Sequence, residues 1–229
     1  MPVKPAGGHV GERHPQDQDA QDRHPLLVHA HIGIWGRCHL PSSSREACGL
    51  GTVDDSALSL TYLDLIWLHA GSVELVFFYP LAVSVSHFID SVVPTLKSSL
   101  STALRHFYPL AGKIRSSAAS SDGYEIHYVD GDSVPFTVAE YSGDFDDLSS
   151  DHSRLFNDML PLLPELPESS IDNNDIQILA LQATLFPECG VVVGISVHHS
   201  ACDGSISTRF LSVWASACAG AGVMVPPSV

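Results

Sequence analysis

Residues 175–199 read DIQILALQATLFPECGVVVGISVHH, and this stretch decides the fold. It contains two runs rich in apolar and β-branched residues, and only Pro187, Glu188, Cys189 and Gly190 lie between them. Two such runs around a short turn are typical of a β-hairpin. The second run, GVVVGISV, is almost continuously apolar, which indicates a buried strand.

Helical patterns lie on both sides of the hairpin in sequence. Downstream, apolar residues follow helical spacing, with Ser205 or Asp203 available to cap the helix start: Ile206, Phe210, Val213, Trp214 and Ala217. Upstream, one apolar residue recurs every four positions: Phe88, Val92, Leu96, Leu100 and Leu104. This spacing predicts a single apolar stripe on a helix, with Pro94 either tolerated near its first turns or kinking it.

The remaining patterns add strands and loops. VELVFFYPL (73–81) has the residues of a buried strand, and YEIHYVDGDSVPFTVAEY (124–141) predicts two short strands around the Asp130–Asp132 turn. LPLLPELPESS (160–170) is too rich in proline for regular structure and predicts a surface loop. Strands and helices alternate without strict βαβ order, so we expect a layered, mixed α/β domain.

The composition excludes several functional classes. The chain has 229 residues, 45% of them hydrophobic, and a mean hydropathy of +0.14, as expected for a folded domain with a sizeable core. Its 26 acidic and 11 basic residues give a net charge of −15. Because this sign opposes binding to phosphate backbones and anionic lipids, we expect neither nucleic-acid nor membrane partners.

The acidic residues are concentrated in one region. Nine of them lie between Asp144 and Asp175, where Arg154 is the only basic residue. We interpret this stretch as a solvated surface, and any anionic ligand would need cations from elsewhere.

Sequence features also bear on the compartment. Five cysteines without paired spacing argue against a disulfide framework. No secretory signal fits the first residues, and the longest apolar run, at 75–85, is too short to span a membrane. We therefore expect a soluble, cytoplasmic protein.

Residues 1–55 differ from residues 56–229. They hold six of the 13 histidines and show no regular period, so we predict a weakly ordered leader before a domain that begins at residue 56. A zinc site would have to use His29, His31, Cys38, His39 and Cys48. Their spacings match no common zinc-ligand pattern, so we expect no metal.

The candidate catalytic side chains lie in HHSACDG, residues 198–204, at the end of the buried strand. A neutral imidazole can accept a proton from a hydroxyl near neutral pH, so His199 is a candidate general base. Asp203 follows four residues later and precedes Gly204. The alternative interpretation is a core histidine that only bonds to the backbone at the strand end.

Several stretches resemble one protein family. The HxxxD pattern of His199 and Asp203, followed by Gly204, is similar to the active-site signature of the plant BAHD acyl-CoA-dependent acyltransferases. HFYPLAGKIR (106–115) also resembles that family, while LTYLDLIWL (60–68), PTLKSSLS (94–101) and ILALQATLF (178–186) resemble its branch that acylates anthocyanins and other phenolic glucosides. The resemblance covers residues 58–228 and does not extend to the leader.

The resemblance implies a fold and a mechanism. The fold would be the N-terminal domain of a two-domain, chloramphenicol-acetyltransferase-like α/β protein. His199 would deprotonate an acceptor hydroxyl, which attacks the thioester of acyl-CoA, a co-substrate rather than a bound cofactor. Asp203 would support the loop, Gly204 would permit a sharp turn that leaves no room for a side chain, and His198 would brace the loop or contact substrate.

Two functions stay open. The first is transfer of a malonyl or hydroxycinnamoyl group from acyl-CoA to a hydroxyl of a phenolic or flavonoid glucoside. The second is a truncated, non-catalytic fragment that self-associates or binds a full-length relative, because family members are longer, act as monomers and carry a second domain with a DFGWG motif absent here. Most family contacts to CoA come from that second domain, so the CoA-binding residues are unknown.

Two further enzyme classes rank lower. A serine hydrolase is disfavoured because no G-x-S-x-G elbow occurs. A peptide-synthesis condensation domain shares the HHxxxDG pattern, but the flanking sequence lacks a carrier-domain context.

Overall fold

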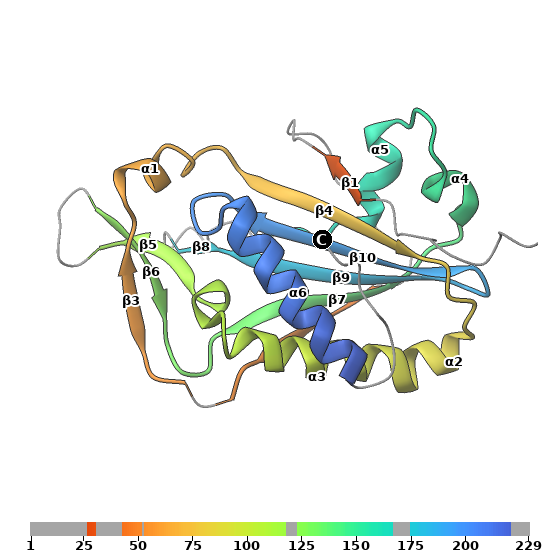
Figure 1. Cartoon of the computed structure of the whole chain (residues 1–229), viewed down its shortest axis with the longest axis horizontal. Helices are drawn as coiled ribbons and strands as arrows, with labels where there is room; N and C mark the ends of the chain where they lie inside the picture. The colour runs from red at the N-terminus through yellow and green to blue at the C-terminus, as the bar shows by residue number, and fades with distance from the viewer. Residues whose placement is uncertain (1–26, 31–42, 52, 118–122, 167–174, 221–229) are drawn as a thin grey trace, which may run out of the picture.

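A six-stranded sheet forms the centre of the computed structural model, which describes residues 27–30, 43–51, 53–117, 123–166 and 175–220 (Figure 1). The strand order is β1 (Leu27–Ala30), β4 (Ser72–Tyr79), β10 (Gly190–His198), β9 (Leu179–Phe186), β7 (Ser133–Glu140) and β2 (Ser43–Gly49). The pair β7–β9 is parallel and the other pairs are antiparallel. The mixed α/β class predicted from the sequence is confirmed.

The predicted hairpin is formed by β9 and β10. Gly190 pairs with Phe186 across the turn, where Glu188 adopts a left-handed backbone with φ 58°. Every residue of both strands is buried. Burial on both faces of the sheet explains the continuous apolar run in β10, because side chains on either face are removed from water.

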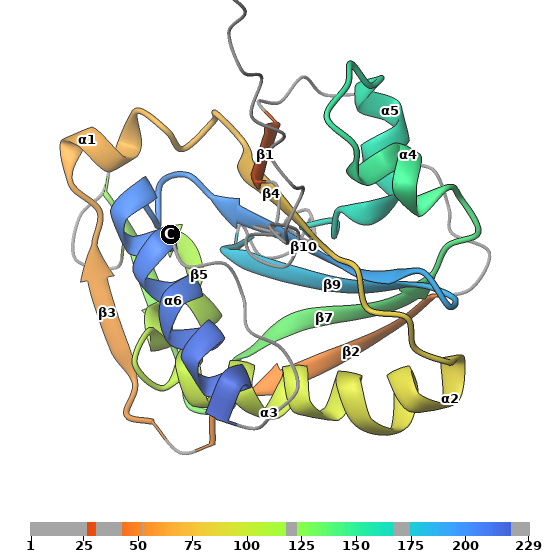
Figure 2. The ribbon, with the colours of Figure 1, turned by 45° about the vertical axis from the view of Figure 1, so that its right-hand side comes forward.

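Two helices cover one face of this sheet, α3 (Val93–Leu104) and α6 (Gly204–Gly220) (Figure 2). The predicted stripe at Phe88–Leu104 is confirmed, since all five of its residues are at most 2% exposed. The same helical segment starts with α2 (Val85–His87) and a π-turn, η1 (Phe88–Val92). The π-turn lies just before Pro94, whose ring nitrogen has no N–H to donate to the preceding turn.

The opposite face is covered by α4 (Phe145–Ser149), α5 (Phe156–Met159) and the 3₁₀ turn η3 (Leu160–Leu162). The prediction of a surface loop at 160–170 is wrong at its start, because Leu162 is fully buried. Its carbonyl oxygen lies so close to Gly194 that a Cβ there would be 2.0 Å away. Proline disfavours long regular elements but does not prevent a short segment from packing on a sheet.

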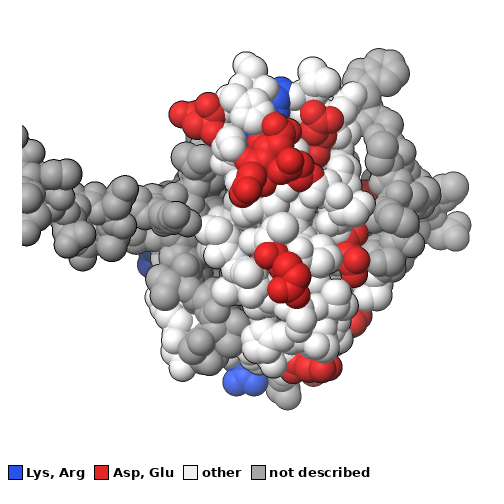
Figure 3. All heavy atoms as spheres, turned by 90° about the vertical axis from the view of Figure 1, so that its right-hand side faces the viewer, with Lys and Arg blue, Asp and Glu red and all other residues white. Residues whose placement is uncertain are grey.

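The acidic stretch 144–158 forms the outer surface of this layer. Asp144, Asp146, Asp147 and Asp158 are exposed, whereas Phe145 points inward and is buried. Acidic side chains gather at the top of the face in Figure 3. The described part of the stretch is therefore solvated, as predicted.

A smaller sheet lies beside the first, with the order β3 (Ser56–Ser59), β6 (Tyr124–Tyr128), β5 (Lys113–Ser116) and β8 (Ile176–Gln177). The 3₁₀ turn η2 (Tyr108–Ala111) precedes β5. The two strands predicted around the Asp130–Asp132 turn are β6 and β7. They belong to different sheets, so this turn carries the chain from one sheet to the other.

The prediction of a weakly ordered leader over residues 1–55 is wrong where the structure describes it. Strand β2 pairs along its whole length with β7, and β1 pairs with β4. Cys48 and Leu50 are 5% and 1% exposed and belong to the main core. The sequence SSREACG lacks apolar alternation because it forms a polar edge strand, and most of the remaining leader lies outside the described residues.

Candidate active site

The end of β10 positions the two histidines. The His198 backbone N–H donates to the Ile178 carbonyl at 2.7 Å, and the His199 N–H donates to the Gly71 carbonyl at 3.4 Å. The strand is thus held by its neighbours on both sides up to its last residue. Because successive side chains of a strand point to opposite faces, His198 and His199 are directed to different surroundings.

His198 lies inside the protein and braces the turn. It is 5% exposed, and its Nδ1 accepts a hydrogen bond from the Ser200 N–H at 3.3 Å. Burial lowers the pKa of His198, and neighbouring His199 adds to this effect, while a hydrogen bond to the Leu68 backbone opposes it. A neutral ring suits the acceptor role of Nδ1.

His199 lies at the rim of the protein and is half-buried. Its imidazole is stacked on the indole of Trp67, with ring centroids 4.1 Å apart and planes 6° from parallel. The Nδ1 atom is buried and has no hydrogen-bond partner within the described part of the chain. This geometry allows a half-buried imidazole to meet a hydroxyl group that approaches from outside.

Asp203 forms the cap of helix α6. Its Oδ1 accepts the Ile206 N–H at 2.8 Å, and its carbonyl accepts the Ser207 N–H at 3.0 Å and hydroxyl at 2.9 Å. The carboxylate thus accepts a backbone N–H, as expected of Asp203 as a candidate helix cap. Asp203 is exposed, and this capping geometry starts the helix that follows the histidines.

The expectation that Gly204 leaves no room for a side chain is wrong. A Cβ built at this position meets no atom within 4 Å, and the backbone is not left-handed. The turn after β10 is made upstream, where the Ala201 N–H donates to the His198 carbonyl at 3.0 Å. Gly204 is simply the first residue of α6.

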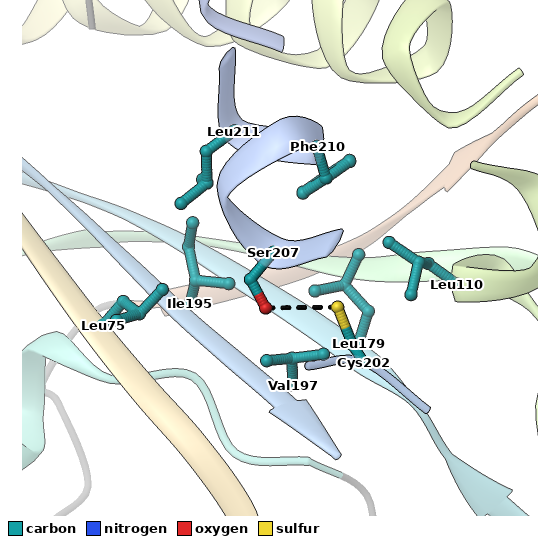
Figure 4. Close-up of a pocket in the computed structure, with 9 residues that line it drawn as sticks. All are labelled: Leu75, Leu110, Leu179, Ile195, Val197, Cys202, Ser207, Phe210 and Leu211. Atoms are coloured by element: carbon teal, nitrogen blue, oxygen red, sulfur yellow. Dashed lines mark hydrogen bonds between the residues drawn. The ribbon is translucent and has the colours of Figure 1, made fainter. Parts of the chain in front are cut away.

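A small apolar hollow lies under the first turns of α6, between the helix and the central strands (Figure 4). Cys202 and Ser207 face each other across it, with Sγ and Oγ 3.1 Å apart. Its other lining residues are aliphatic or aromatic: Leu75, Leu110, Leu179, Ile195, Val197, Phe210 and Leu211. This hollow lacks the charged groups that a CoA phosphate requires.

Most cations of the described chain already have partners. Arg105 Nε donates to the Leu50 carbonyl at 3.0 Å, and Arg154 Nε donates to the Asp147 carbonyl at 3.5 Å. The ion pairs with carboxylates are Lys97–Glu46, Lys113–Asp132 at 3.8 Å and Arg115–Glu125 at 2.9 Å. This supports the expectation that an anionic ligand needs cations from elsewhere.

The described ranges contain neither a cluster of metal ligands nor a membrane-spanning helix. No group of three or more His, Cys, Asp or Glu side chains there is arranged to hold a metal ion. His31, Cys38 and His39 of the zinc alternative lie outside those ranges. No helix within them is long and apolar enough to cross a membrane.

Trp67 is the site residue that the sequence patterns did not identify. It follows helix α1 (Tyr62–Leu65), whose start is a capping box of Thr61 and Asp64. The pattern T-x-x-D in LTYLDLIWL is a recognisable signal for that helix start. No pattern within the segment predicts that Trp67 would meet a residue more than a hundred positions later.

The comparisons with known proteins agree on one family. Residues 51–229 match the Transferase family. Malonyl-coenzyme A:anthocyanin 3-O-glucoside-6''-O-malonyltransferase of Dahlia pinnata is 37% identical over 172 residues, which cover 73% of this chain and 37% of that protein. Phenolic glucoside malonyltransferase 1 of Arabidopsis thaliana is 38% identical over 170 residues, covering 74% and 35%. The chain thus spans well under half the length of these relatives.

Solved structures support the fold. Vinorine synthase superposes with a TM-score of 0.55 at 22% identity, covering 81% of this chain and 45% of that one. TRI101 of F. graminearum, in complex with ethyl coenzyme A, gives a TM-score of 0.53 at 15% identity, covering 76% and 40%. The expected chloramphenicol-acetyltransferase-like architecture is confirmed.

Proposed function

Since the chain belongs to the Transferase family of BAHD acyltransferases, we propose that it supplies the general base of an enzyme that acylates a hydroxyl of a phenolic or flavonoid glucoside. The donor would be a malonyl or hydroxycinnamoyl thioester of CoA, because the relatives include malonyltransferases and a coumaroyltransferase. The observation that carries the proposal is the half-buried His199, held at the end of a rigid, fully buried strand.

The proposed reaction needs one proton acceptor and no covalent enzyme intermediate. His199 takes the proton of the acceptor hydroxyl while the oxygen attacks the thioester carbonyl. The tetrahedral intermediate collapses, the carbon–sulfur bond breaks, and the CoA thiolate leaves and receives the proton from the imidazolium. The products are the ester and free CoA, and His199 returns to its neutral form.

The surroundings of Ser200 favour this direct transfer over serine-based hydrolysis. The Ser200 side chain is 3% exposed, and its hydroxyl oxygen is buried without a hydrogen-bond partner in the described structure. A nucleophilic serine must contact both its base and the substrate carbonyl. The Ser200 hydroxyl makes no hydrogen bond to His199 in the described structure and is shielded from solvent, so acyl-enzyme chemistry at this residue is disfavoured.

The acidic surface bears on how CoA would be bound. Exposed acids dominate the described face over α4 and α5, and nearly all described cations are engaged by carboxylates or carbonyls. We propose that the cations for the CoA phosphates lie outside the described residues. The isolated chain is therefore expected to bind CoA weakly and to show no turnover, since positioning contributes several kcal/mol, up to roughly 7–11, to lowering such barriers.

The test joins this chain at Val229 to the remaining C-terminal part of the Dahlia relative. The fused protein receives malonyl-CoA and an anthocyanidin 3-glucoside, and the ester is quantified by chromatography. We expect turnover by the fusion and a loss of about 10²–10⁴-fold in kcat on His199→Gln. The matched control is His198→Gln with folding checked by circular dichroism, because this substitution changes the adjacent ring without removing the proposed base.

Two results would overturn the proposal. The first is turnover by the fusion that survives His199→Gln. The second is a fusion that folds and binds malonyl-CoA yet forms no ester.

The alternative, a non-catalytic fragment, is favoured by one observation. The α1 segment exposes a row of large apolar side chains, with exposed fractions of 81%, 69% and 59% at Tyr62, Leu63 and Ile66. Such surfaces often mark contacts with another molecule. Dimerisation of the isolated chain in analytical ultracentrifugation, abolished by Leu63→Ser, would support this second candidate.

A further inference from the structure

Trp67 lies directly on the imidazole of His199, and hydrogen bonds hold the chain segment that carries the tryptophan. The capping box gives α1 a defined start, with the Thr61 N–H donating to Asp64 Oδ2 at 2.7 Å. The Trp67 N–H donates to the Asp64 carbonyl at 3.1 Å, and the Ala70 N–H donates to the Trp67 carbonyl at 3.0 Å. Figures 1 and 2 show α1 and the start of α6 at the same end of the sheet.

The two segments are also joined by the backbone. The Gly71 carbonyl, four residues after Trp67, accepts the N–H of His199. Gly71 has a φ of 83°, a left-handed conformation that glycine adopts without steric cost. The turn into β4 therefore brings the tryptophan ring against the strand end.

The ring orientation of His199 has no hydrogen-bonded support among the described residues. Its Nδ1 is buried without a partner, whereas a proton-transferring histidine usually has this atom held by a carboxylate or carbonyl. The nearest carboxylate in sequence, Asp203, caps α6 through the Ile206 N–H. Among the described residues, the aromatic ring stacked on the imidazole is the indole of Trp67, 4.1 Å away and within 6° of parallel.

The geometry points to Trp67 as a positioning residue for His199, with its indole fixing the imidazole plane and stabilising the imidazolium formed when His199 takes a proton. This inference rests on the proposed role of His199 as general base. A cation over the face of an indole is attracted by the negative charge of the ring face. The stack thus favours the charged state that develops during proton transfer and limits the ring to one plane.

The exposure of Trp67 indicates that its side chain is not needed to fill the hydrophobic core. Trp67 is 43% exposed, whereas the next residue, Leu68, is 7% exposed and belongs to the main core. Leu68 therefore anchors the segment. Replacement of Trp67 is expected to remove the stack while the domain stays folded.

The primary test is nuclear magnetic resonance on the full 229-residue chain with isotope-labelled histidine. His199→Gln assigns the His199 signal, and the wild-type carbon-bound ring protons are expected to be shifted upfield by the indole ring current. Trp67→Leu should abolish this shift and broaden the signal, while Trp67→Phe should retain part of it. The matched control is Tyr62→Leu, which removes an aromatic ring from the preceding helix α1 and should leave the His199 signal unchanged.

The second readout is kinetic and uses the fused protein described above. Trp67→Leu should lower kcat by about 10–100-fold with little change in KM, since misplacement of a reacting group acts on the chemical step. Trp67→Phe should restore most of the loss.

The possible failures are distinguishable. An unchanged His199 signal in Trp67→Leu, or a rise in KM with constant kcat, overturns the positioning role. Loss of His199 dependence in the fused protein overturns the proposed function instead, while the resonance test still decides whether the stack exists.

Discussion

His198 and His199 are identical side chains that the fold places in opposite environments. His198 is buried and accepts a hydrogen bond within the turn, whereas His199 is half-buried against an indole. Strand alternation produces this difference without any change in residue type. The sequence pair HH therefore contains one bracing residue and one candidate for chemistry.

Asp203 offers a residue-scale prediction, because its side chain caps α6. Asp203→Ala should lower the free energy of unfolding by about 1 kcal/mol, since the Ile206 N–H loses its acceptor. Asp203→Asn should stay close to wild type, because asparagine caps equally well. Urea denaturation measures both. An equal loss in the two variants would show that the negative charge, rather than the cap, matters.

Glu74 offers a prediction about pH. Its Oε2 is buried with no partner among the described atoms, and burial raises the pKa of this carboxyl, partly opposed by a hydrogen bond with Ser72. A carboxyl whose pKa is higher in the folded state contributes most stability below its unfolded value and loses it as the pH rises through the folded pKa. The loss therefore starts near the ordinary value of 4.5 and extends upward.

Glu74→Gln removes this ionisation. The variant should gain stability relative to wild type as the pH rises from about 4 to about 7, measured as the difference in unfolding free energy by urea denaturation at each pH. Glu140→Gln, at an exposed position, is the control and should follow wild type. A difference between Glu74→Gln and wild type that shrinks with rising pH would contradict the prediction.

At the scale of elements, Gly194 in strand β10 and Gly204 at the start of α6 differ in how much room they leave for a side chain. A Cβ on Gly194 of β10 would lie 2.0 Å from the Leu162 carbonyl oxygen, so η3 could not keep its place on the sheet. A Cβ on Gly204 of α6 would meet open space. The close approach of a 3₁₀ turn to a central strand thus depends on Gly194.

This contrast predicts the outcome of one substitution at two sites. Gly194→Ala should destabilise the domain by about 1–3 kcal/mol through overpacking. Gly204→Ala should leave the free energy of unfolding unchanged or raise it by up to about 1 kcal/mol, because alanine restricts the unfolded chain. Thermal and urea unfolding compare the two variants. A larger loss of unfolding free energy for Gly204→Ala than for Gly194→Ala would show that the close packing depends on Gly204 instead.

The elements also show how far sequence reasoning reaches. Continuous apolar runs identified the β9–β10 hairpin, and helical spacing identified α6 and the Phe88–Leu104 stripe, because these patterns are local in the sequence. Such patterns missed β2, whose polar residues pair at a sheet edge, and the burial of Leu162, which depends on Gly194 in another segment. They also missed the Trp67–His199 stack, since no local pattern encodes a contact between distant segments.

At the scale of the whole molecule, strand β2 closes one edge of the central sheet. It pairs with β7 from Ser43 to Gly49, and Leu50 follows into the core. Without β2, the backbone N–H and C=O groups along one side of β7 would lose their partners. An uncovered edge strand is a template for pairing with another chain.

Truncation tests this role of β2. A chain that begins at residue 53 should unfold at a markedly lower temperature than one that begins at residue 43, and it should aggregate faster. Differential scanning fluorimetry and light scattering provide the two measurements. Equal melting temperatures for the two truncations would show that β2 contributes nothing to the sheet.

The pairing of β4 with β10 has a consequence for biosynthesis. Residues 72–79 lie next to residues 190–198 in the sheet, so the inner edge of β4 finds its partner only after almost the whole described chain has left the ribosome. Until then the segment VELVFFY, apolar and rich in β-branched and aromatic residues, has an unpaired edge during translation. Sheets closed by such distant pairings fold slowly, because a long loop must be ordered first. Newly made chains are therefore expected to depend on chaperones that shield this segment until the last strand arrives.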